Sequence, residues 1–530
     1  MLALFGRLIY WALGLVAILL IAFLGFRAYT SLQGAQLEPW HTYAPTELTV
    51  DEIDDADWQK YLQAENAVFD SVRANVTDKL AAEERAPFNR YFEGSPVNPE
   101  HFTQNWNRSY RLEPKGAPIG AVVMLHGLTD SPYSLRHLAA LYVDRGYAVF
   151  AIRMPAHGTT PAALAGVEWR EWLAATRLAV REARRLVAAP APLEIVGFSN
   201  GGSLALKYAL DAIEDLRLPR ASRLILISPM VGVTAFARFA GLAGLPAAFP
   251  AFARAAWLSI IPEFNPFKYN SFPVNGARQS WRLTDAVQQQ LETLNRDGRI
   301  STLPPVLTFQ SVIDFTVSTR AILSGLYARL PQNGSELVLF DINRNAKFGP
   351  LFRASAEAKL SEVAPPGIRN YRLSIIENAG EGTDDARERF IAAGGLEERT
   401  RRLEMKYPDG VYSLSHVALP FPLTDSLYGL APDGAEDFGV QLGALPLRGE
   451  RGALIVSLDA LVRMSSNPFF SYLTDRISEG LPARKSGQSS PEIKVEAPPE
   501  AGGNIDGAGK GEERKRSLRS PAHHPRPRTK

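Results

Sequence analysis

The most extended apolar run of the chain lies near its N-terminal end. Residues 8–26 carry no charge and are mostly apolar, with Arg7 before them and Arg27 after them. At a rise of 1.5 Å per helical residue, a run of this length spans roughly 30 Å, the thickness of the hydrocarbon core of a bilayer. No small-x-small cleavage site follows Phe26, so the pattern favours an uncleaved transmembrane helix over a signal peptide. Residues 1–30 are therefore predicted to form a membrane anchor.

The basic residues around this run suggest its orientation. The N-terminal amine and Arg7 precede the run, and after Arg27 the next Lys or Arg is Lys60. Because cytoplasmic flanks carry an excess of Lys and Arg, the main body is predicted to lie across the membrane from the cytoplasm. A bacterial inner membrane, with the main body facing the periplasm, is the setting that this orientation favours.

Helical periodicity returns in residues 31–118. An acidic patch at residues 51–57 is followed by apolar residues at mostly helical spacing between Trp58 and Leu80. This spacing predicts one amphipathic helix in an N-terminal helical extension. Packing of that helix on the rest of the chain is favoured, and binding of a partner protein remains the alternative.

From residue 119 onwards, short apolar runs alternate with helical stretches. This rhythm is typical of an α/β fold, a mostly parallel sheet flanked by helices on both faces. Ligands of such sheets gather at the carboxyl ends of the strands, so the loops there are the places to look for chemistry. The predicted strands are 121–125, 148–152, 193–196, 224–227, 306–309 and 336–340.

Two segments interrupt this rhythm, and a third ends it. Residues from about 230 to 285 are rich in Ala, Phe and Pro without a strand signal, which predicts a helical cap over the carboxyl edge of the sheet. A second insertion runs from about 342 to 408. The predicted domain of 119–480 contains both. Residues 481–530 are rich in Pro, Gly, Ser and basic residues, which predicts a disordered basic tail.

Composition narrows the range of functions. Of 530 residues, 46% are hydrophobic and 22% charged, as in a globular protein with a packed core. The net charge is +2, but residues 481–530 hold 11 Lys and Arg against 6 Asp and Glu, so the rest of the chain is slightly acidic. Nucleic acid is therefore not an expected partner. The chain has no cysteine, which excludes thiol catalysis, disulfides and cysteine-bound metals.

A G-x-S-x-G pattern stands at residues 197–201. An apolar run, 193–196, precedes it and a helix-prone segment, 203–210, follows it. A serine hydroxyl is a weak nucleophile, and a strand-to-turn-to-helix context presents it where a base can reach it. Ser199 is therefore predicted to be a nucleophile, against the alternative of a surface turn.

The order of the residues restricts the base that could activate Ser199. Hydrolases with this serine turn place the acid and then the histidine after the serine. Of the eight histidines, only His416, His523 and His524 follow Ser199, and the last two lie in the predicted tail. His416 is therefore the predicted base.

The acid is expected in a loop that follows a strand. Asp314 comes shortly after the strand 306–309, and Asp341, directly after the next strand, is the alternative. Either carboxylate could orient the imidazole of the base and stabilise its protonated form.

An oxyanion at the substrate carbonyl needs preorganised N–H donors. The backbone N–H of Asn200 follows the nucleophile directly, and the backbone N–H of Leu128 lies in the loop after the first predicted strand. His126 in the same loop is interpreted as structural, because a second base would have no role.

Five segments together resemble the α/β-hydrolase superfamily, and most of all its carboxylesterases, monoglyceride lipases and lysophospholipases. They are VVMLHGLTDSPYSLRHLA (122–139), RMPAHGTTPAAL (153–164), IVGFSNGGSLAL (195–206), SVIDFTV (311–317) and SLSHVALP (413–420). The resemblance implies the α/β-hydrolase fold with a cap, a triad of Ser199, Asp314 and His416, and oxyanion donors at Leu128 and Asn200. Two features depart from the pattern: Ala156 stands where glycine is frequent, and 102 positions separate the acid from the base.

The sequence thus predicts a membrane-anchored serine hydrolase that cleaves carboxylic esters through an acyl-enzyme, without metal or cofactor. A small-molecule or lipid ester is the expected substrate, because the predicted cap is apolar and the anchor would hold the site near a bilayer. Thioester hydrolysis and peptide or amide hydrolysis remain alternatives on the same fold. A catalytically silent, membrane-tethered scaffold is the alternative from another class.

Overall fold

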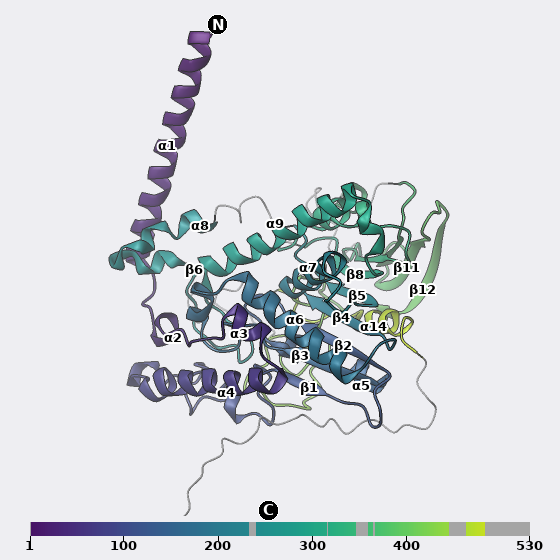
Figure 1. Cartoon of the computed structure of the whole chain (residues 1–530), viewed down its shortest axis with the longest axis horizontal. Helices are drawn as coiled ribbons and strands as arrows, with labels where there is room; N and C mark the ends of the chain where they lie inside the picture. Colours follow the sequence, from purple (N-terminus) through teal and green to yellow (C-terminus); the bar gives the residue numbers. More distant parts are fainter. Residues whose placement is uncertain are drawn as a thin grey trace, which may run out of the picture. The chain divides into compact units, whose positions relative to one another are not determined.

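A ten-stranded sheet lies at the centre of the protein (Figure 1). The computed structural model describes residues 2–232, 240–314, 316–345, 359–363, 366–444 and 463–482. The strand order is β1-β3-β2-β4-β5-β8-β9-β10-β11-β12. The strands from β3 to β10 pair in parallel, and β1, β11 and β12 pair antiparallel at the two edges. The predicted α/β class with a mostly parallel sheet is therefore confirmed.

Every one of the six predicted strands is present. Burial on both faces explains why they were visible as continuous apolar runs in the sequence. Nearly all of their residues are buried. The strands are β2 (Gly120–Leu125), β3 (Tyr147–Ile152), β4 (Leu193–Phe198), β5 (Arg223–Ile227), β8 (Val306–Ser311) and β9 (Glu336–Phe340).

Side chains that alternate along the strands enter two separate hydrophobic clusters. Val123 lies in the cluster beneath α6 and α7, whereas Val122 lies in the cluster beneath α5 and α14. The sheet is thus covered on both faces, as Figure 1 shows. The helices on these faces are α5 (Arg136–Asp144), α6 (Trp169–Leu186), α7 (Asn200–Glu214), α9 (Val274–Arg296) and α14 (Phe470–Ser478).

The second insertion extends the sheet. It contributes β10 (Arg372–Asn378), β11 (Asp385–Ile391) and β12 (Glu398–Lys406), and β1 (Tyr110–Leu112) closes the other edge. None of these strands was predicted. Charged residues make up much of β11 and β12, and cross-strand ion pairs such as Arg401 with Glu388 hold them together. Such strands lack the apolar run that reveals a buried one.

The N-terminal region contains helices at both predicted places. Within α1 (Leu2–Gln33), the segment 5–33 has the length and the apolar composition needed to cross a membrane. A signal sequence would meet the same two criteria. The amphipathic helix is α4 (Trp58–Asn75), whose buried apolar side chains include Trp58, Leu62 and Val68. Two short helices, α2 (Pro39–Thr42) and α3 (Val50–Asp54), lie between α1 and α4.

The cap differs in detail from the predicted helical segment without strands. It contains α8 (Ala240–Ala243) and two 3-10 helices, η7 (Leu245–Ala248) and η8 (Pro250–Ala256). An antiparallel pair, β6 (Trp257–Ser259) with β7 (Phe272–Pro273), follows them. Pro246 and Pro250 begin new helical turns and prevent one long helix. Regular helix resumes only with α9, which runs past the predicted end of the cap at residue 285.

Parts of three predicted segments lie outside the described residues. They are 233–239 of the cap, 346–358 and 364–365 of the second insertion, and 483–530 of the basic tail. Two further short helices belong to the described part, α10 (Thr319–Gly325) and α12 (Lys359–Val363).

Candidate active site

Ser199 occupies the sharp turn between β4 and α7. Its φ is 56° and its ψ is −115°, a conformation that residues other than glycine rarely adopt. The flanking glycines allow the turn, because a Cβ on Gly197 would lie 2.4 Å from the Gly201 carbonyl oxygen, and one on Gly201 would lie 2.0 Å from the Leu125 carbonyl oxygen. The predicted strand-to-turn-to-helix context of the G-x-S-x-G pattern is thus present.

His416 lies between Ser199 and Asp314. Its Nε2 atom is 2.9 Å from the Ser199 Oγ, and its Nδ1 atom is 3.0 Å from the Asp314 Oδ2. With the ring proton on Nδ1, the imidazole donates to the carboxylate and accepts the hydrogen bond of the serine hydroxyl. This arrangement leaves Nε2 free to take the hydroxyl proton.

Asp314 is fixed by four hydrogen-bond donors. Its Oδ1 accepts the backbone N–H groups of Thr316 and Val317 at 2.8 Å each, and its Oδ2 accepts the Gln310 side chain at 3.0 Å in addition to His416. Burial raises the pKa of Asp314, but the bonds from His416 and from the backbone outweigh burial, so that the pKa lies below its usual value. The carboxylate therefore stays ionised at neutral pH.

The alternative acid, Asp341, is engaged elsewhere. Its carboxylate accepts the Arg344 guanidinium at 2.8 and 3.2 Å and is almost fully buried. The structure thus brings Asp314, and not Asp341, to His416.

Two backbone N–H groups beside Ser199 are unengaged. Neither the N–H of Leu128 nor that of Asn200 makes a hydrogen bond to any residue in the described part of the chain. The loop that carries Leu128 passes close to Ser199, since a Cβ on Gly127 would lie 3.2 Å from the Ser199 Cβ. Both groups are therefore available to an oxyanion.

His126 joins two loops. Its Nδ1 is 2.9 Å from the Gly127 carbonyl oxygen, and its Nε2 accepts the backbone N–H of Met154 at 3.0 Å. Burial, with the nearby His157, lowers the pKa of His126 well below its usual value, so the ring is neutral. These contacts agree with a structural role, and they tie the loop of Leu128 to the loop after β3.

Sequence reasoning missed several supporting residues. Ser280 on α9 donates to the Asn200 side chain at 2.8 Å. At the end of β8, the Gln310 side chain donates to Asp314, and the Ser311 hydroxyl donates to the Leu414 carbonyl oxygen. No motif marks Ser280 or Gln310, and the SVIDFTV segment that begins at Ser311 was noted for Asp314 alone. Gln310 and Ser311 directly continue a predicted strand, which was the one signal that could have found them.

The second insertion leaves and returns at neighbouring points. The N–H of Asn343 donates to the Tyr412 carbonyl oxygen at 2.9 Å, and the Asn343 side chain donates to the Val411 carbonyl oxygen at 3.0 Å. The described part of the second insertion thus extends along the sheet and returns beside the point at which it leaves.

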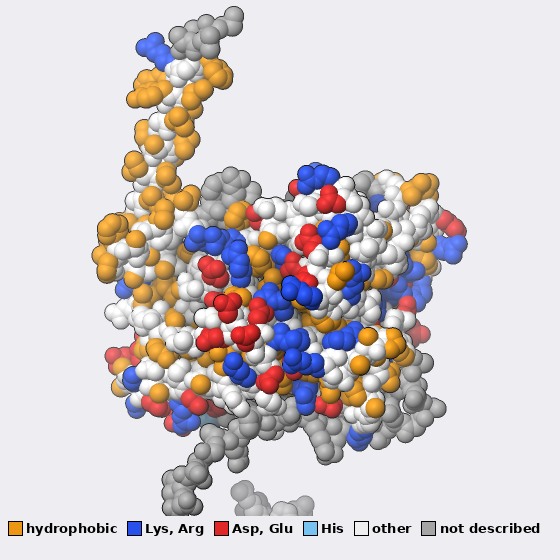
Figure 2. All heavy atoms as spheres, in the orientation of Figure 1, with side chains coloured by type: hydrophobic (Ala, Val, Ile, Leu, Met, Phe, Trp, Pro, Cys, Tyr) orange, Lys and Arg blue, Asp and Glu red, His pale blue; other side chains and the backbone are white. Residues whose placement is uncertain are grey.

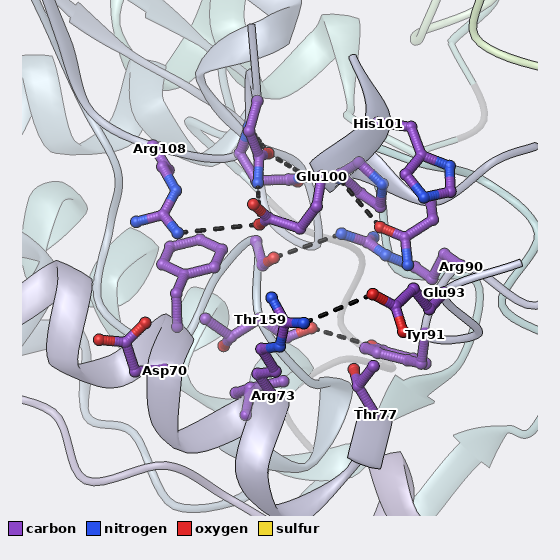
Figure 3. A pocket seen from close by; sticks show the side chains of 17 residues that line it. Asp70, Arg73, Thr77, Arg90, Tyr91, Glu93, Glu100, His101, Arg108 and Thr159 are labelled. Atoms are coloured by element: carbon purple, nitrogen blue, oxygen red, sulfur yellow. Dashed lines mark hydrogen bonds and ion pairs between the residues drawn. The ribbon is translucent and has the colours of Figure 1, made fainter. Parts of the chain in front are cut away.

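The predicted nucleophile is covered in this conformation. Ser199 is 5% exposed and His416 is 4% exposed. A cavity of about 270 Å³ lies elsewhere, between the C-terminal end of α4, the segment 90–108 and Gly158–Thr159 (Figure 3). None of the three candidate triad residues lines that cavity.

The described residues contain no candidate metal site. No group of three or more His, Cys, Asp or Glu side chains there is placed to hold an ion. The expected absence of a metal or cofactor stays a prediction.

A match to a family model agrees with this fold. Residues 116–341 match the family model described as serine aminopeptidase, S33, a hydrolase family. The chain has the α/β-hydrolase fold, and the proteins to which it is similar include esterase- and lipase-like hydrolases.

One curated relative and two solved structures illustrate the similarity. The thermostable monoacylglycerol lipase of Bacillus sp. (strain H-257) is 30% identical over 95 residues, which are 18% of this chain and 36% of that protein. The match therefore spans about a third of the length of the relative.

The two structures have lower identity. The first comes from a study of two metagenome-derived lipolytic enzymes, LipS and LipT, and is 24% identical with a TM-score of 0.34. The match covers 45% of this chain and 88% of that chain. The other, of a soluble variant of the Saccharomyces cerevisiae monoglyceride lipase with a substrate analogue, is 17% identical with a TM-score of 0.33 and covers 43% and 81%.

Proposed function

We propose that this protein is a membrane-anchored serine hydrolase that cleaves carboxylic esters. Ser199 is the nucleophile, His416 the general base and Asp314 the orienting acid. The observation that carries the proposal is the continuous hydrogen-bonded chain from the Ser199 Oγ through His416 to Asp314, with distances of 2.9 and 3.0 Å. The esterase- and lipase-like relatives support the same reaction class.

The reaction follows from this geometry. As His416 Nε2 takes the hydroxyl proton, the Ser199 Oγ attacks the ester carbonyl carbon, and the N–H groups of Leu128 and Asn200 stabilise the oxyanion. Asp314 stabilises the imidazolium. His416 then gives its proton to the leaving alcohol, and the acyl-enzyme forms. A water molecule, activated in the same way, releases the acid and restores Ser199.

A lipid-like acyl ester is the proposed substrate class. Three observations support it: the apolar cap, the apolar helix α1, and the similarity to a protein named as a monoacylglycerol lipase. Peptide or amide hydrolysis is the second candidate, because the matching family model is described as an aminopeptidase. A panel of fatty acyl esters, thioesters and aminoacyl amides separates these candidates. An optimum at short chains or on amides would contradict the lipid ester.

Labelling by a fluorophosphonate probe tests the nucleophile and the base. The detergent-solubilised wild type should be labelled, and Ser199→Ala and His416→Ala should not. Ser324→Ala and His101→Ala, which replace exposed residues of the same types, are the matched controls and should keep the label. A folded wild type that stays unlabelled would favour the silent scaffold.

The topology needs a separate experiment. A reporter that is active only outside the cytoplasm, fused after residue 480, should be active if the hydrolase body lies across the membrane. Silence of the fusion together with good expression would contradict this placement.

A further inference from the structure

The end of α1 is attached to the cap through the side chain of Arg27. Its guanidinium donates three hydrogen bonds to backbone carbonyl oxygens of the cap, at 2.9 to 3.2 Å. The acceptors are Ala243, Ala255 and Trp257. A single side chain from α1 thus joins α8, η8 and β6.

A second arginine makes the reverse connection. Arg254 of η8 donates to the carbonyl oxygens of Ser31 and Leu32, near the C-terminal end of α1, at 3.3 and 3.2 Å. The last carbonyl groups of a helix have no partner within the helix and attract a cation. Arg27 and Arg254 together form a reciprocal clamp between α1 and the cap.

The position of Arg27 sets the depth of the cap. Arg27 directly follows the apolar run of residues 8–26. If α1 spans the bilayer, its guanidinium lies where hydrocarbon gives way to headgroups. The cap carbonyl groups that it binds must then lie at the same level.

The cap face next to α1 is suited to that level. Residues 240–262 contain one charged residue, and this is Arg254 of the clamp. Figure 2 shows hydrophobic side chains continuing from α1 onto the adjoining part of the body. The exposed large apolar residues of this face are Leu242, Leu245, Phe249 and Leu258.

We propose that this face, formed by α8, η7, η8 and β6, rests in the headgroup and acyl boundary of the same bilayer that α1 spans. The inference rests on the proposed membrane anchoring. Continuity with α1 favours a lipid surface over a second copy of the chain, because the clamp brings the face to the membrane whatever other contact it makes. The cap is thereby a fixed contact with the membrane. The next helix, α9, bears Ser280, which donates a hydrogen bond to Asn200 beside the proposed nucleophile.

The absence of native cysteine allows a direct measurement of depth. Full-length Phe249→Cys, carrying an environment-sensitive fluorophore, is reconstituted in phosphatidylcholine and phosphatidylglycerol vesicles. The matched control is Leu216→Cys with the same fluorophore, because Leu216 is an exposed leucine in the loop after α7. The label at 249 should be quenched several-fold more by lipid-borne nitroxide than by iodide, and the label at 216 should show the reverse.

Two outcomes would overturn the proposal. One is equal exposure of both labels to iodide. The other is protection at 249 that persists in detergent and depends on protein concentration, since this would identify a second copy as the occupant. Fluorophosphonate labelling of the same samples reports on the proposed hydrolase separately, so that failure of one proposal is distinguished from failure of the other.

The variant Arg27→Ala tests whether the clamp holds the cap against α1. Arg27→Ala should leave α1 in the membrane but make the label at 249 more accessible to iodide, whereas Arg7→Ala, at the other end of the apolar run, should not. Retained fluorophosphonate labelling confirms that the Arg27→Ala protein is folded. Unchanged accessibility in that folded protein would show that the arginine does not hold the cap.

Discussion

Neighbouring residues hold Ser199 in an unfavourable backbone conformation. The positive φ of Ser199 costs on the order of 1–3 kcal/mol. The backbone around it is held from both sides, because the Ser199 N–H donates to Ile227 at 2.9 Å and its carbonyl accepts the N–H of Met230 at 3.0 Å. This support keeps the Oγ aimed at His416.

Replacing Asp314 tests the orienting acid at the same scale. Asp314→Asn should lower kcat by roughly 10³- to 10⁴-fold, because an amide no longer holds the Nδ1 proton of His416 or stabilises the imidazolium. Asp341→Asn is the matched comparison and should keep kcat within about tenfold, since the carboxylate of Asp341 bonds Arg344 and not His416. Turnover of a soluble p-nitrophenyl ester measures both. The opposite ranking would assign the acid to Asp341.

A buried carboxyl in the cap predicts a pH dependence of stability. Burial raises the pKa of Glu263 to about 7, although the N–H groups of Asn270 and Ser271 and the charge of Arg90 oppose the rise. The folded state therefore holds this proton more tightly than the unfolded state, whose value is 4.5. The resulting stability is fully present below pH 4.5 and is lost as the pH rises through about 7.

The size of this effect is about 3 kcal/mol. Thermal unfolding of wild type and Glu263→Gln in detergent, at pH 5 and pH 8, measures it as the difference between the two proteins. The wild type should lose more stability than the variant on going to pH 8. Glu292→Gln, an exposed glutamate on α9, is the control and should behave as the wild type does. Parallel curves for wild type and Glu263→Gln would contradict the raised pKa.

Among the elements, the loop after β3 depends on the N-terminal extension. Arg153 at the start of this loop is almost fully buried and bonds both oxygens of Glu47, at 2.7 and 2.9 Å, and Glu65 at 2.9 Å. Glu47 also accepts the N–H of Ala156, which has a φ of 68°. Glu47 of the extension thereby stabilises the positive φ of Ala156, a position at which the similar carboxylesterases and lipases frequently have glycine.

Breaking this cluster should destabilise the fold. Arg153→Met leaves the buried Glu65 and the partly exposed Glu47 without their cation and should lower the free energy of unfolding by about 3–5 kcal/mol. Denaturation followed by tryptophan fluorescence measures the loss. Arg217→Met, at an exposed pair with Asp215, is the matched control and should change nothing measurable. A small effect of Arg153→Met would mean that water or rearrangement satisfies Glu47 and Glu65.

For the whole molecule, anchoring and chemistry should be separable. No hydrogen bond of the candidate triad involves α1. A variant without residues 2–26 should therefore keep fluorophosphonate labelling and turnover of a soluble ester in detergent. Its activity on an ester presented in vesicles should fall about tenfold or more, because the substrate is no longer at high local concentration. Equal loss of both activities would indicate that α1 is needed for the fold of the site.

The sequence by itself determined the central sheet and the candidate chemistry. Buried parallel strands are continuous apolar runs, and for this reason all six central strands were predicted. The turn at Ser199 has a local glycine signature. His416 emerged because few histidines follow Ser199, and Asp314 because it follows a strand. Their catalytic roles stay a prediction.

Only the tertiary structure decided what surrounds that chemistry. The strands β11 and β12 are stabilised by ion pairs across the sheet, and no continuous apolar run in the sequence reveals them. The return of the chain at Tyr412, the contact of Ser280 with Asn200, and the clamp of Arg27 and Arg254 each join residues far apart in sequence. Such contacts depend on where the folded chain brings donors and acceptors together, and local patterning carries no information about them.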